Sequence, residues 1–182
     1  MSKSTARGDI GARYVTRMAE EFKFCPRCGR ALVNKAHHGR ERALCEAQGC
    51  GFVHWGNPTP VVAAIIEHEG QVLLARGKNW PEKMFALVTG FLEAAESPEQ
   101  GVLREVKEEV GLEGEVASLV GVYPFELRNE LIIAFHVRTA GPITLGDELA
   151  AYKLIPKEKL KAWPMGTGLA VQAWIDRGFK GA

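Results

Sequence analysis

The chain has 182 residues, of which 46% are hydrophobic and 25% are charged. These proportions are those of a soluble globular protein and exclude a fibrous or largely disordered chain. An average domain has about 150 residues, so the length predicts one main domain with a small attachment. The sequence contains no apolar run of the roughly 18 residues that a membrane span needs. Because residues 1–22 also lack the apolar segment of a secretory signal, we expect a cytoplasmic protein with no membrane partner.

The formal net charge of +1 conceals two charged segments. Residues 1–60 contain 10 Lys or Arg against 5 Asp or Glu. Residues 90–112 contain 6 Glu against one Arg and one Lys. A functional interpretation must therefore account for a basic N-terminal part and for one acidic cluster.

The cysteines point to a metal site in the basic part. The chain has four, all within 26 residues: Cys25, Cys28, Cys45 and Cys50. Thiols stay reduced in the cytoplasm, so a disulfide framework is the less favoured interpretation. Two pairs, C-x2-C and a wider C-x4-C, separated by 16 residues, are typical of a zinc ribbon. Four thiolates leave no open coordination position, so we expect a structural Zn²⁺.

Two alternatives stay open for this segment. The four cysteines could be free or partly paired, or His37 or His38 could replace one of them as a ligand. Zinc ribbons also bind nucleic acid, and the local charge permits it. However, the thiolates reduce that charge, and no aromatic run accompanies the basic residues as a stacking platform would require. A nucleic-acid partner is therefore permitted but not favoured.

After an extended Pro-containing connector at 57–60, the remainder alternates strands with a few helices. We expect strands at 61–66, 72–76, 85–89, 116–122, 131–138 and 149–155, the first two forming a hairpin. We expect helices at 98–110, 157–162 and 168–176. This order indicates an α/β domain in which helices cover a mixed sheet.

The helix at 98–110 has clear start and stop signals. Ser97 is suited to the N-cap, Pro98 to the first turn and Gln100 to a capping box, and Gly111 is suited to the left-handed C-cap. An apolar stripe on this helix must face the core: Val102, Leu103, Val106 and Val110.

Three carboxylates lie beside that stripe, from Glu105, Glu108 and Glu109. Like charges at these spacings cost a few tenths of a kcal/mol per pair in an isolated helix. A divalent cation, which prefers oxygen ligands, would turn this repulsion into binding. For three glutamates alone, a solvated acidic helix face would be the better interpretation.

The wider pattern changes that interpretation. Residues 90–112 match G-x5-E-x7-R-E-U-x-E-E-x-G-U, where U is apolar, at every fixed position. Through this motif the chain resembles the Nudix family over roughly residues 57–178. The resemblance implies an α/β/α sandwich with a mixed sheet. It also implies hydrolysis of a nucleoside diphosphate linked to another moiety.

The resemblance implies roles for the matched residues. The three glutamates would bind Mg²⁺ or Mn²⁺, with a backbone carbonyl from Thr89 or Gly90, and activate a water that attacks a diphosphate phosphorus. Arg104 would orient the carboxylates, and Glu96 would support the loop before the helix. Many relatives take a further glutamate from a later loop.

For that further ligand or base, Glu148 is our first candidate and Glu130 our second. Four aromatic residues could stack a base, although core or hairpin packing is the more expected role for each: Trp80, Phe85, Tyr123 and Phe125.

A ribbon directly before this domain resembles the NADH pyrophosphatases and a neighbouring group acting on FAD or ADP-ribose. The run at 89–93 is also similar to the former. However, Ala94 and Ala95 replace the usual Pro-Gly or Gly-Gly, and of the S-Q-P-W-P-F-P motif residues 122–127 keep only a Pro-Phe core. We therefore expect a divalent-metal-dependent hydrolase acting on compounds of the NAD(H), ADP-ribose or FAD type, without assigning NADH specificity.

The expected organisation is an N-terminal extension at 1–21, partly helical or disordered, a zinc ribbon at 22–56 and a Nudix domain at 57–182. Relatives are often dimers, so a homodimer is one expectation. The alternative function is a nucleotide-sensing or RNA-binding regulator built on the same fold. The intact set of glutamates favours the enzyme, because a pure binder could lose them.

Overall fold

The computed structural model describes residues 22–181, so the predicted N-terminal extension lies outside the described residues. The chain divides into two compact units. The smaller comprises residues 22–58 with Glu126–Asn129, and the larger comprises Thr59–Phe125 with residues 130–181. In the part of the chain that is described, no helix is long and apolar enough to cross a membrane.

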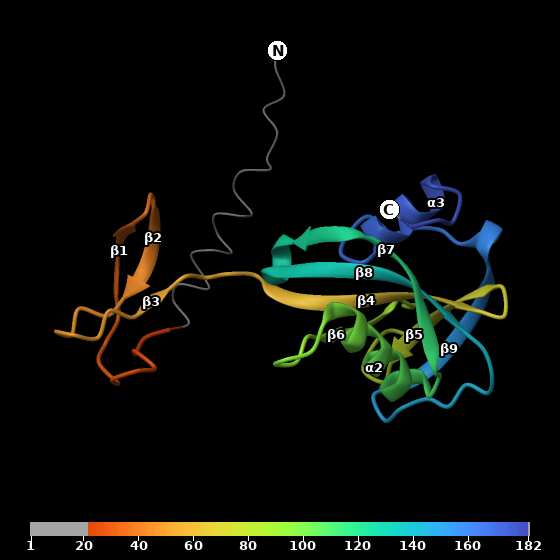
Figure 1. Cartoon of the computed structure of the whole chain (residues 1–182), viewed down its shortest axis with the longest axis horizontal. Coiled ribbons are helices and arrows are strands. Elements are labelled where there is room, and N and C mark those ends of the chain that lie inside the picture. The colour runs from red at the N-terminus through yellow and green to blue at the C-terminus, as the bar shows by residue number, and fades with distance from the viewer. Residues whose placement is uncertain (1–21, 182) are drawn as a thin grey trace, which may run out of the picture. The chain divides into compact units, whose positions relative to one another are not determined.

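The smaller unit is built on a three-stranded antiparallel sheet (Figure 1). Its strands are β1 (Val33–His37), β2 (Arg40–Leu44) and β3 (Val53–His54), in that order. His38 and Gly39 join β1 to β2 with φ of 49° and 74°. Positive φ at both positions is the signature of the tight two-residue turn that suits the twist of a hairpin.

The larger unit is a six-stranded mixed sheet. Its strands are β4 (Thr59–His68), β5 (Gln71–Gly77), β6 (Val88–Phe91), β7 (Gly114–Phe125), β8 (Glu130–Thr139) and β9 (Leu149–Pro156). The order is β7-β8-β4-β5-β9, and β6 also pairs with β4. The β4–β8 pair is parallel, whereas the other pairs are antiparallel. The predicted hairpin is therefore confirmed as β4–β5.

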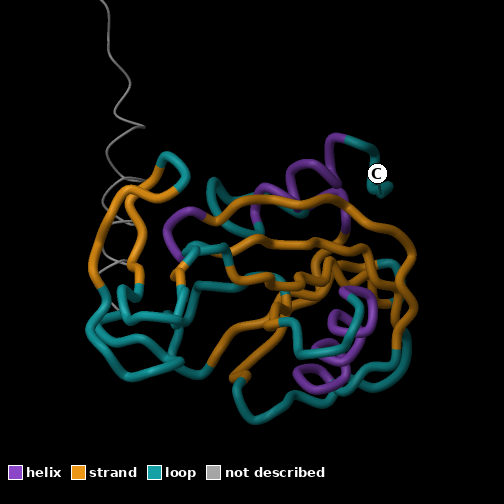
Figure 2. The backbone as a smooth tube through the Cα atoms, turned by 60° about the vertical axis from the view of Figure 1, so that its left-hand side comes forward, coloured by secondary structure: helices purple, strands orange, loops and turns teal. Residues whose placement is uncertain are grey.

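Helices cover both faces of this sheet: α2 (Pro98–Val110) lies on one and α3 (Gly168–Asp176) on the other (Figure 2). Successive β4 residues point to opposite faces. Val62 packs in the core beneath α2, and Ala63 packs in the core with Trp174 of α3. Because both faces are covered, the central residues 61–66 of β4 are all apolar, as their continuous apolar run indicated. The predicted α/β/α sandwich with a mixed sheet is confirmed.

The predicted ends of α2 are confirmed. The Ser97 side chain accepts from the Gln100 backbone N–H, and the Gln100 side chain accepts from the Ser97 N–H. Gly111 has φ of 69° and donates its N–H to the carbonyl of Lys107. Val102, Val106 and Val110 are buried. The caps and the apolar stripe together fix where the helix begins and which side faces the core.

Two predicted elements were wrong in extent. The strand expected at 85–89 is β6, which begins only at Val88, because Ala86 forms an isolated bridge with Ala75 before the chain crosses to β4. The helix expected at 157–162 is a single 3-10 turn, η2 (Lys157–Lys159). Leu160 is buried and adopts extended φ and ψ, so its burial in the core ends the turn. A second 3-10 turn, η1 (Glu126–Arg128), follows β7.

Candidate active site

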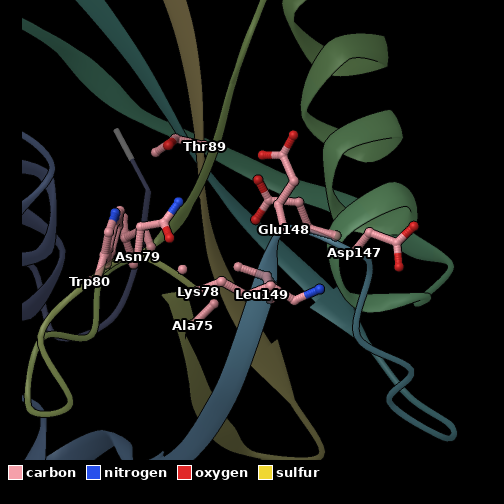
Figure 3. Close-up of a pocket in the computed structure, with 11 residues that line it drawn as sticks. Ala75, Lys78, Asn79, Trp80, Thr89, Asp147, Glu148 and Leu149 are labelled. Atoms are coloured by element: carbon pink, nitrogen blue, oxygen red, sulfur yellow. The ribbon is translucent and has the colours of Figure 1, made fainter.

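A pocket opens where β5 and β6 diverge along β4. β6 pairs with residues 61–64 of β4, and β5 pairs with residues 66–68. The pocket has a volume of about 580 Å³, and its lining includes Trp80, Thr89, Glu109 and Glu148. In Figure 3, Trp80 and Asn79 lie across the pocket from Glu148. The pocket therefore brings the loop after β5, the strand β6, the helix α2 and the start of β9 together.

Arg104 organises the carboxylates at the start of α2. Its Nη2 donates to Glu96 Oε1 at 2.8 Å and to the carbonyl of Phe91 at 3.0 Å, and its Nε donates to Glu96 Oε2 at 3.1 Å. Its Nη1 donates to Glu105 Oε1 at 2.7 Å and to Glu108 Oε2 at 3.0 Å. All five N–H donors of the guanidinium thus have acceptors. The side chain cannot move without breaking several charge-assisted bonds, so it holds these three carboxylates in fixed positions.

Glu96 ties the loop before α2 to this network. The N–H of Glu93 donates to Glu96 Oε1 at 2.7 Å. The Arg104 guanidinium and this N–H lower the pKa of Glu96 below its usual value. Glu96 is therefore a carboxylate that is fully compensated by its own neighbours.

The carboxylate of Glu105 lies directly against the backbone of Gly90. A Cβ added at Gly90 would lie 1.8 Å from the Glu105 carboxyl carbon. Only a residue without a side chain can occupy this position, which gives the first glycine of the motif a physical reason. The Glu105 carboxylate therefore packs directly on the Gly90 backbone.

The loop between β8 and β9 is fastened across the end of α2. Thr144 donates its N–H to the carbonyl of Val110 at 3.0 Å, and Gly146 donates to the carbonyl of Glu109 at 2.8 Å. A helix leaves its last four carbonyls without internal partners, and this loop satisfies two of them. The same contacts hold Glu148 beside the helix, and its carbonyl accepts from the N–H of Lys78 at 2.9 Å.

Glu109 is the least compensated carboxylate of the cluster. Burial first, and then the charges of Glu105, Glu148 and Glu108, raise its pKa to about 7. Burial also raises the pKa of Glu105, against the opposing effect of Arg104. Arg104 pairs with Glu96, Glu105 and Glu108, whereas the charges that shift the pKa of Glu109 all come from carboxylates, so the charge around Glu109 is unbalanced. A cation would remove that imbalance.

The other predicted candidates lie in different positions. Glu130 begins β8 and is not part of the pocket lining. Phe85, Tyr123 and Phe125 pack against the core on the α3 side, as the packing interpretation expected. Trp80 is 40% exposed and lines the pocket.

The sequence analysis missed Lys78, Asn79 and Asp147, which also line the pocket. In Figure 3 the Asp147 carboxylate points away from Trp80. The signal that could have identified Lys78 and Asn79 is a polar turn placed directly after a buried strand, where binding residues often lie.

The four cysteines of the smaller unit form a separate cluster. Their sulfurs all lie within 4.8 Å of one another, and all four are free thiols. The Sγ atoms of Cys25 and Cys50 are 3.6 Å apart, and those of Cys28 and Cys45 are 3.4 Å apart. Four sulfurs at the usual Zn–S distance in a tetrahedron are about 3.8 Å apart. The wider second pair therefore closes on the first, and the set is compatible with a metal site.

Backbone groups also favour thiolates in this cluster. Burial opposes ionisation of Cys25, but the N–H groups of Arg27 and Cys28, together with the neighbouring thiols, lower its pKa to about 7. The Arg27 N–H lies 3.4 Å from the Cys25 sulfur. Although the Ala47 N–H favours the thiolate of Cys45, burial and the other three sulfurs raise its pKa to about 12. A bound cation would favour the thiolate forms of Cys25 and Cys45.

Comparisons with known proteins identify the family of the chain. The NUDIX domain model matches residues 56–171. The NAD-capped RNA hydrolase NudC of Vibrio atlanticus is 28% identical over 124 residues, which cover 68% of this chain and 45% of the relative. The same enzyme of Pseudomonas aeruginosa is 31% identical over 118 residues, which cover 65% of this chain and 41% of the relative. The chain thus spans less than half the length of these two relatives.

A solved structure extends the comparison to the fold. The crystal structure of a NUDIX hydrolase from Nitrosomonas europaea is 25% identical, with a TM-score of 0.70. The structural match covers 88% of this chain and 95% of the Nitrosomonas europaea chain. With the family model matching more than half of its residues, the chain belongs to the Nudix hydrolase family.

Proposed function

We propose that the protein is a divalent-metal-dependent hydrolase that cleaves the diphosphate linkage of nucleoside diphosphate derivatives. The observation that carries the proposal is the uncompensated carboxylate cluster of α2, with Glu109 at the wall of the 580 Å³ pocket. A pocket of this size accommodates a ligand as large as a nucleotide.

The donor set fits a hard divalent cation. Glu105, Glu108 and Glu109 offer carboxylate oxygens, and the Gly90 backbone approaches Glu105 so closely that no side chain fits between them. Such oxygen ligands suit Mg²⁺ or Mn²⁺. When bound, the cation would neutralise charge on the phosphate oxygens and lower the pKa of the attacking water.

The side chains of this protein have separate roles in the proposal. Arg104 orients the carboxylates of Glu105 and Glu108 by donating to both, and its own position is fixed by Glu96. Glu148, which raises the pKa of Glu109 through its charge, lies at the pocket and is the candidate for a further ligand or for the base that accepts the proton of water. Water adds to one phosphorus, the bridging P–O bond breaks, and two phosphate monoesters result.

The relatives and the pocket support a dinucleotide-type substrate. The two NudC relatives are named as hydrolases of NAD-capped RNA, so a dinucleotide linkage of the NAD type is the first substrate to test. ADP-ribose and FAD contain the same nucleoside diphosphate core. Trp80, which is 40% exposed in the pocket, is available to stack a base or a nicotinamide ring.

For the smaller unit we propose a structural Zn²⁺ held by Cys25, Cys28, Cys45 and Cys50. Their clustered free thiols support a site that has no open position for a substrate. Free thiols also support a reducing compartment such as the cytoplasm. Metal analysis of protein purified without chelator should find about one zinc per chain, and a value well below one would contradict the site.

A homodimer stays a prediction that light scattering tests.

The proposed activity is tested by incubating the protein with NADH, NAD, ADP-ribose, FAD, diadenosine polyphosphates and nucleoside triphosphates, with Mg²⁺ or Mn²⁺. Chromatography should reveal two phosphate monoesters from at least one dinucleotide-type substrate. Glu108→Gln and Glu109→Gln should abolish most of this cleavage, whereas Glu158→Gln, an exposed carboxylate outside the site, should not. The proposal fails if no substrate is cleaved, or if the two site variants cleave as fast as the parent.

A further inference from the structure

The smaller unit gathers aromatic and basic side chains that are scattered along the sequence. Trp55 lies 5.6 Å from the ring of His37 and 6.0 Å from the ring of His38, between ring centroids. The Arg42 guanidinium lies over the Trp55 ring at 4.8 Å from its centroid, and Arg42 Nη1 donates to the Trp55 carbonyl. The sequence has no aromatic run in this segment, but tertiary contacts bring Trp55 beside basic side chains.

The strand register places the basic residues on the same face. Cross-strand partners share a face, and side chains alternate along each strand. Lys35 pairs with Arg42 and His37 with Arg40. Leu44, two residues beyond Arg42, pairs with Val53, and Trp55 is two residues beyond Val53. We call this set the ribbon face: Lys35, His37, Arg40, Arg42 and Trp55. Glu41, by the same alternation, belongs to the opposite face.

This arrangement is unfavourable for an isolated hairpin. Like charges directly opposite each other in an antiparallel pair are destabilising, and here Lys35 faces Arg42. Lys35 is partly compensated by an ion pair with Glu46, but Arg40 and Arg42 are not among the ion pairs of the described residues. Residues 22–58 as a whole contain six Lys or Arg against two Glu. A polyanion laid along the face would turn this repulsion into attraction.

The aromatic part distinguishes one polyanion from others. Trp55 is 46% exposed although it contacts a guanidinium and two imidazoles. Exposed aromatic rings beside cations stack the bases of single strands, while the cations contact the phosphates. An acidic peptide or a duplex would use the charges but would not need the indole ring.

We propose that the ribbon face binds single-stranded nucleic acid, with a base stacked on Trp55 and phosphates contacted by Arg40 and Lys35. The proposal goes beyond hydrolysis of the diphosphate, because it assigns a ligand to a surface of the smaller unit alone. It is measured as binding without added Mg²⁺ or Mn²⁺, so that its outcome is independent of the proposed catalytic activity.

The experiment measures fluorescence anisotropy of labelled 12-nucleotide oligouridylate and oligothymidylate, with a 12-base-pair duplex and polyglutamate as competitors. The parent should bind both single strands at low salt and should release them to unlabelled single strand more readily than to duplex or polyglutamate. Trp55→Ala should weaken binding about tenfold. Arg40→Gln should lower the slope of log K against log salt by about 0.7.

Two matched controls accompany these variants. Lys161→Gln removes one exposed cation from the larger unit, and Phe24→Ala removes an exposed aromatic of the smaller unit that is not part of the ribbon face. Both should bind like the parent, and every variant is compared only after its thermal unfolding curve and zinc content match the parent.

Binding by RNA alone, by DNA alone or by both supports the proposal and identifies the preferred strand. The proposal is overturned if the parent binds neither strand, if duplex or polyglutamate competes as well as single strand, or if Trp55→Ala weakens binding no more than the two controls do.

Discussion

The larger unit contains two half-buried carboxylates that are held in opposite ways. Glu67 on β4 accepts from Lys157 Nζ at 2.7 Å and pairs with His136 Nε2 at 2.8 Å. Burial opposes its ionisation, but these two partners lower its pKa below the usual value. Glu109 on α2 has carboxylates as its charged neighbours, and its pKa is raised to about 7.

The opposite pKa shifts distinguish two kinds of cluster. Glu67 has positively charged or hydrogen-bonding partners, whereas the charged neighbours that shift the pKa of Glu109 are other carboxylates. The Glu67 cluster is complete, because its charge is balanced by side chains of the same unit. Around Glu109 on α2 the charges that act on the carboxylate are negative, and in the proposed function a divalent cation compensates them. Perturbed pKa values occur in both, so the sign of the shift and the identity of its cause distinguish function from stability here.

The largest expected effect is on catalysis, and it should occur in variants of the α2 carboxylates but not in variants of Glu67. Glu105→Gln removes the negative charge of a proposed cation ligand and its ion pair with Arg104, so hydrolysis of the best substrate should fall by roughly 10²–10⁴-fold. Glu67→Gln should leave hydrolysis within about twofold of the parent. Initial rates at saturating Mg²⁺ or Mn²⁺ provide the measurement. Equal losses in both variants would show that the two clusters are not different in kind.

The second effect is on stability and should occur when Glu67 is removed. Glu67→Ala leaves His136 and Lys157 without their carboxylate, so the free energy of unfolding should fall by about 3 kcal/mol at pH 7. The pKa of Glu67 is lower in the folded than in the unfolded protein. Its contribution to the free energy of unfolding is therefore present above the unfolded pKa of about 4.3 and is lost as pH falls through the folded pKa. Urea unfolding at pH 7 and at low pH measures both. A variant as stable as the parent at pH 7 would contradict the structural role.

The third effect has the opposite dependence on pH. The pKa of Glu109 is higher in the folded than in the unfolded protein. Its contribution to the free energy of unfolding is therefore present below about pH 4.3 and is lost as pH rises through about 7. In protein freed of Mg²⁺ and Mn²⁺, Glu109→Gln should therefore raise the free energy of unfolding at pH 8 by about 1–2 kcal/mol, after allowance for its partial exposure. At pH 4 the two proteins should be nearly equal. The exposed control Glu158→Gln should change neither value, and a destabilised Glu109→Gln at pH 8 would refute the imbalance.

The smallest effect concerns the backbone beside the α2 carboxylates. Ala95 has φ of 68°, a left-handed conformation that costs a non-glycine residue roughly 1–2 kcal/mol. Ala95→Gly should therefore stabilise the protein by about 0.5–1 kcal/mol, while Ala94→Gly, at a position without positive φ, should destabilise it slightly. Thermal unfolding of the two variants gives the comparison. Stabilisation by both glycines, or by neither, would be inconsistent with strain at Ala95.

The sequence predicted best what local interactions determine. The caps of α2, its buried stripe and the β4–β5 hairpin depend on residues a few positions apart, and the Nudix motif lies within one 23-residue segment. The fixed spacing of Gly90 and Glu105 is meaningful because the two meet in space, although the sequence alone gave no distance.

What could not be predicted depends on contacts between distant segments. The strand at 85–89 was displaced because Ala86 pairs with Ala75, and the helix at 157–162 was shortened because Leu160 is drawn into the core. Glu148 comes to α2 because the loop before it satisfies the last carbonyls of the helix. Trp55 meets Arg42 only when the three strands of the smaller unit are aligned.

The central claim is that the α2 carboxylates form a cation site, and thermal unfolding during a Mn²⁺ titration at pH 7.5 tests it most directly. An ion that binds only the folded state raises the midpoint as its concentration exceeds its dissociation constant. We predict that Mn²⁺ raises the midpoint of the parent and of Glu67→Gln but not that of Glu109→Gln. A parent midpoint that does not respond to Mn²⁺, or an equal rise in Glu109→Gln, would contradict the claim.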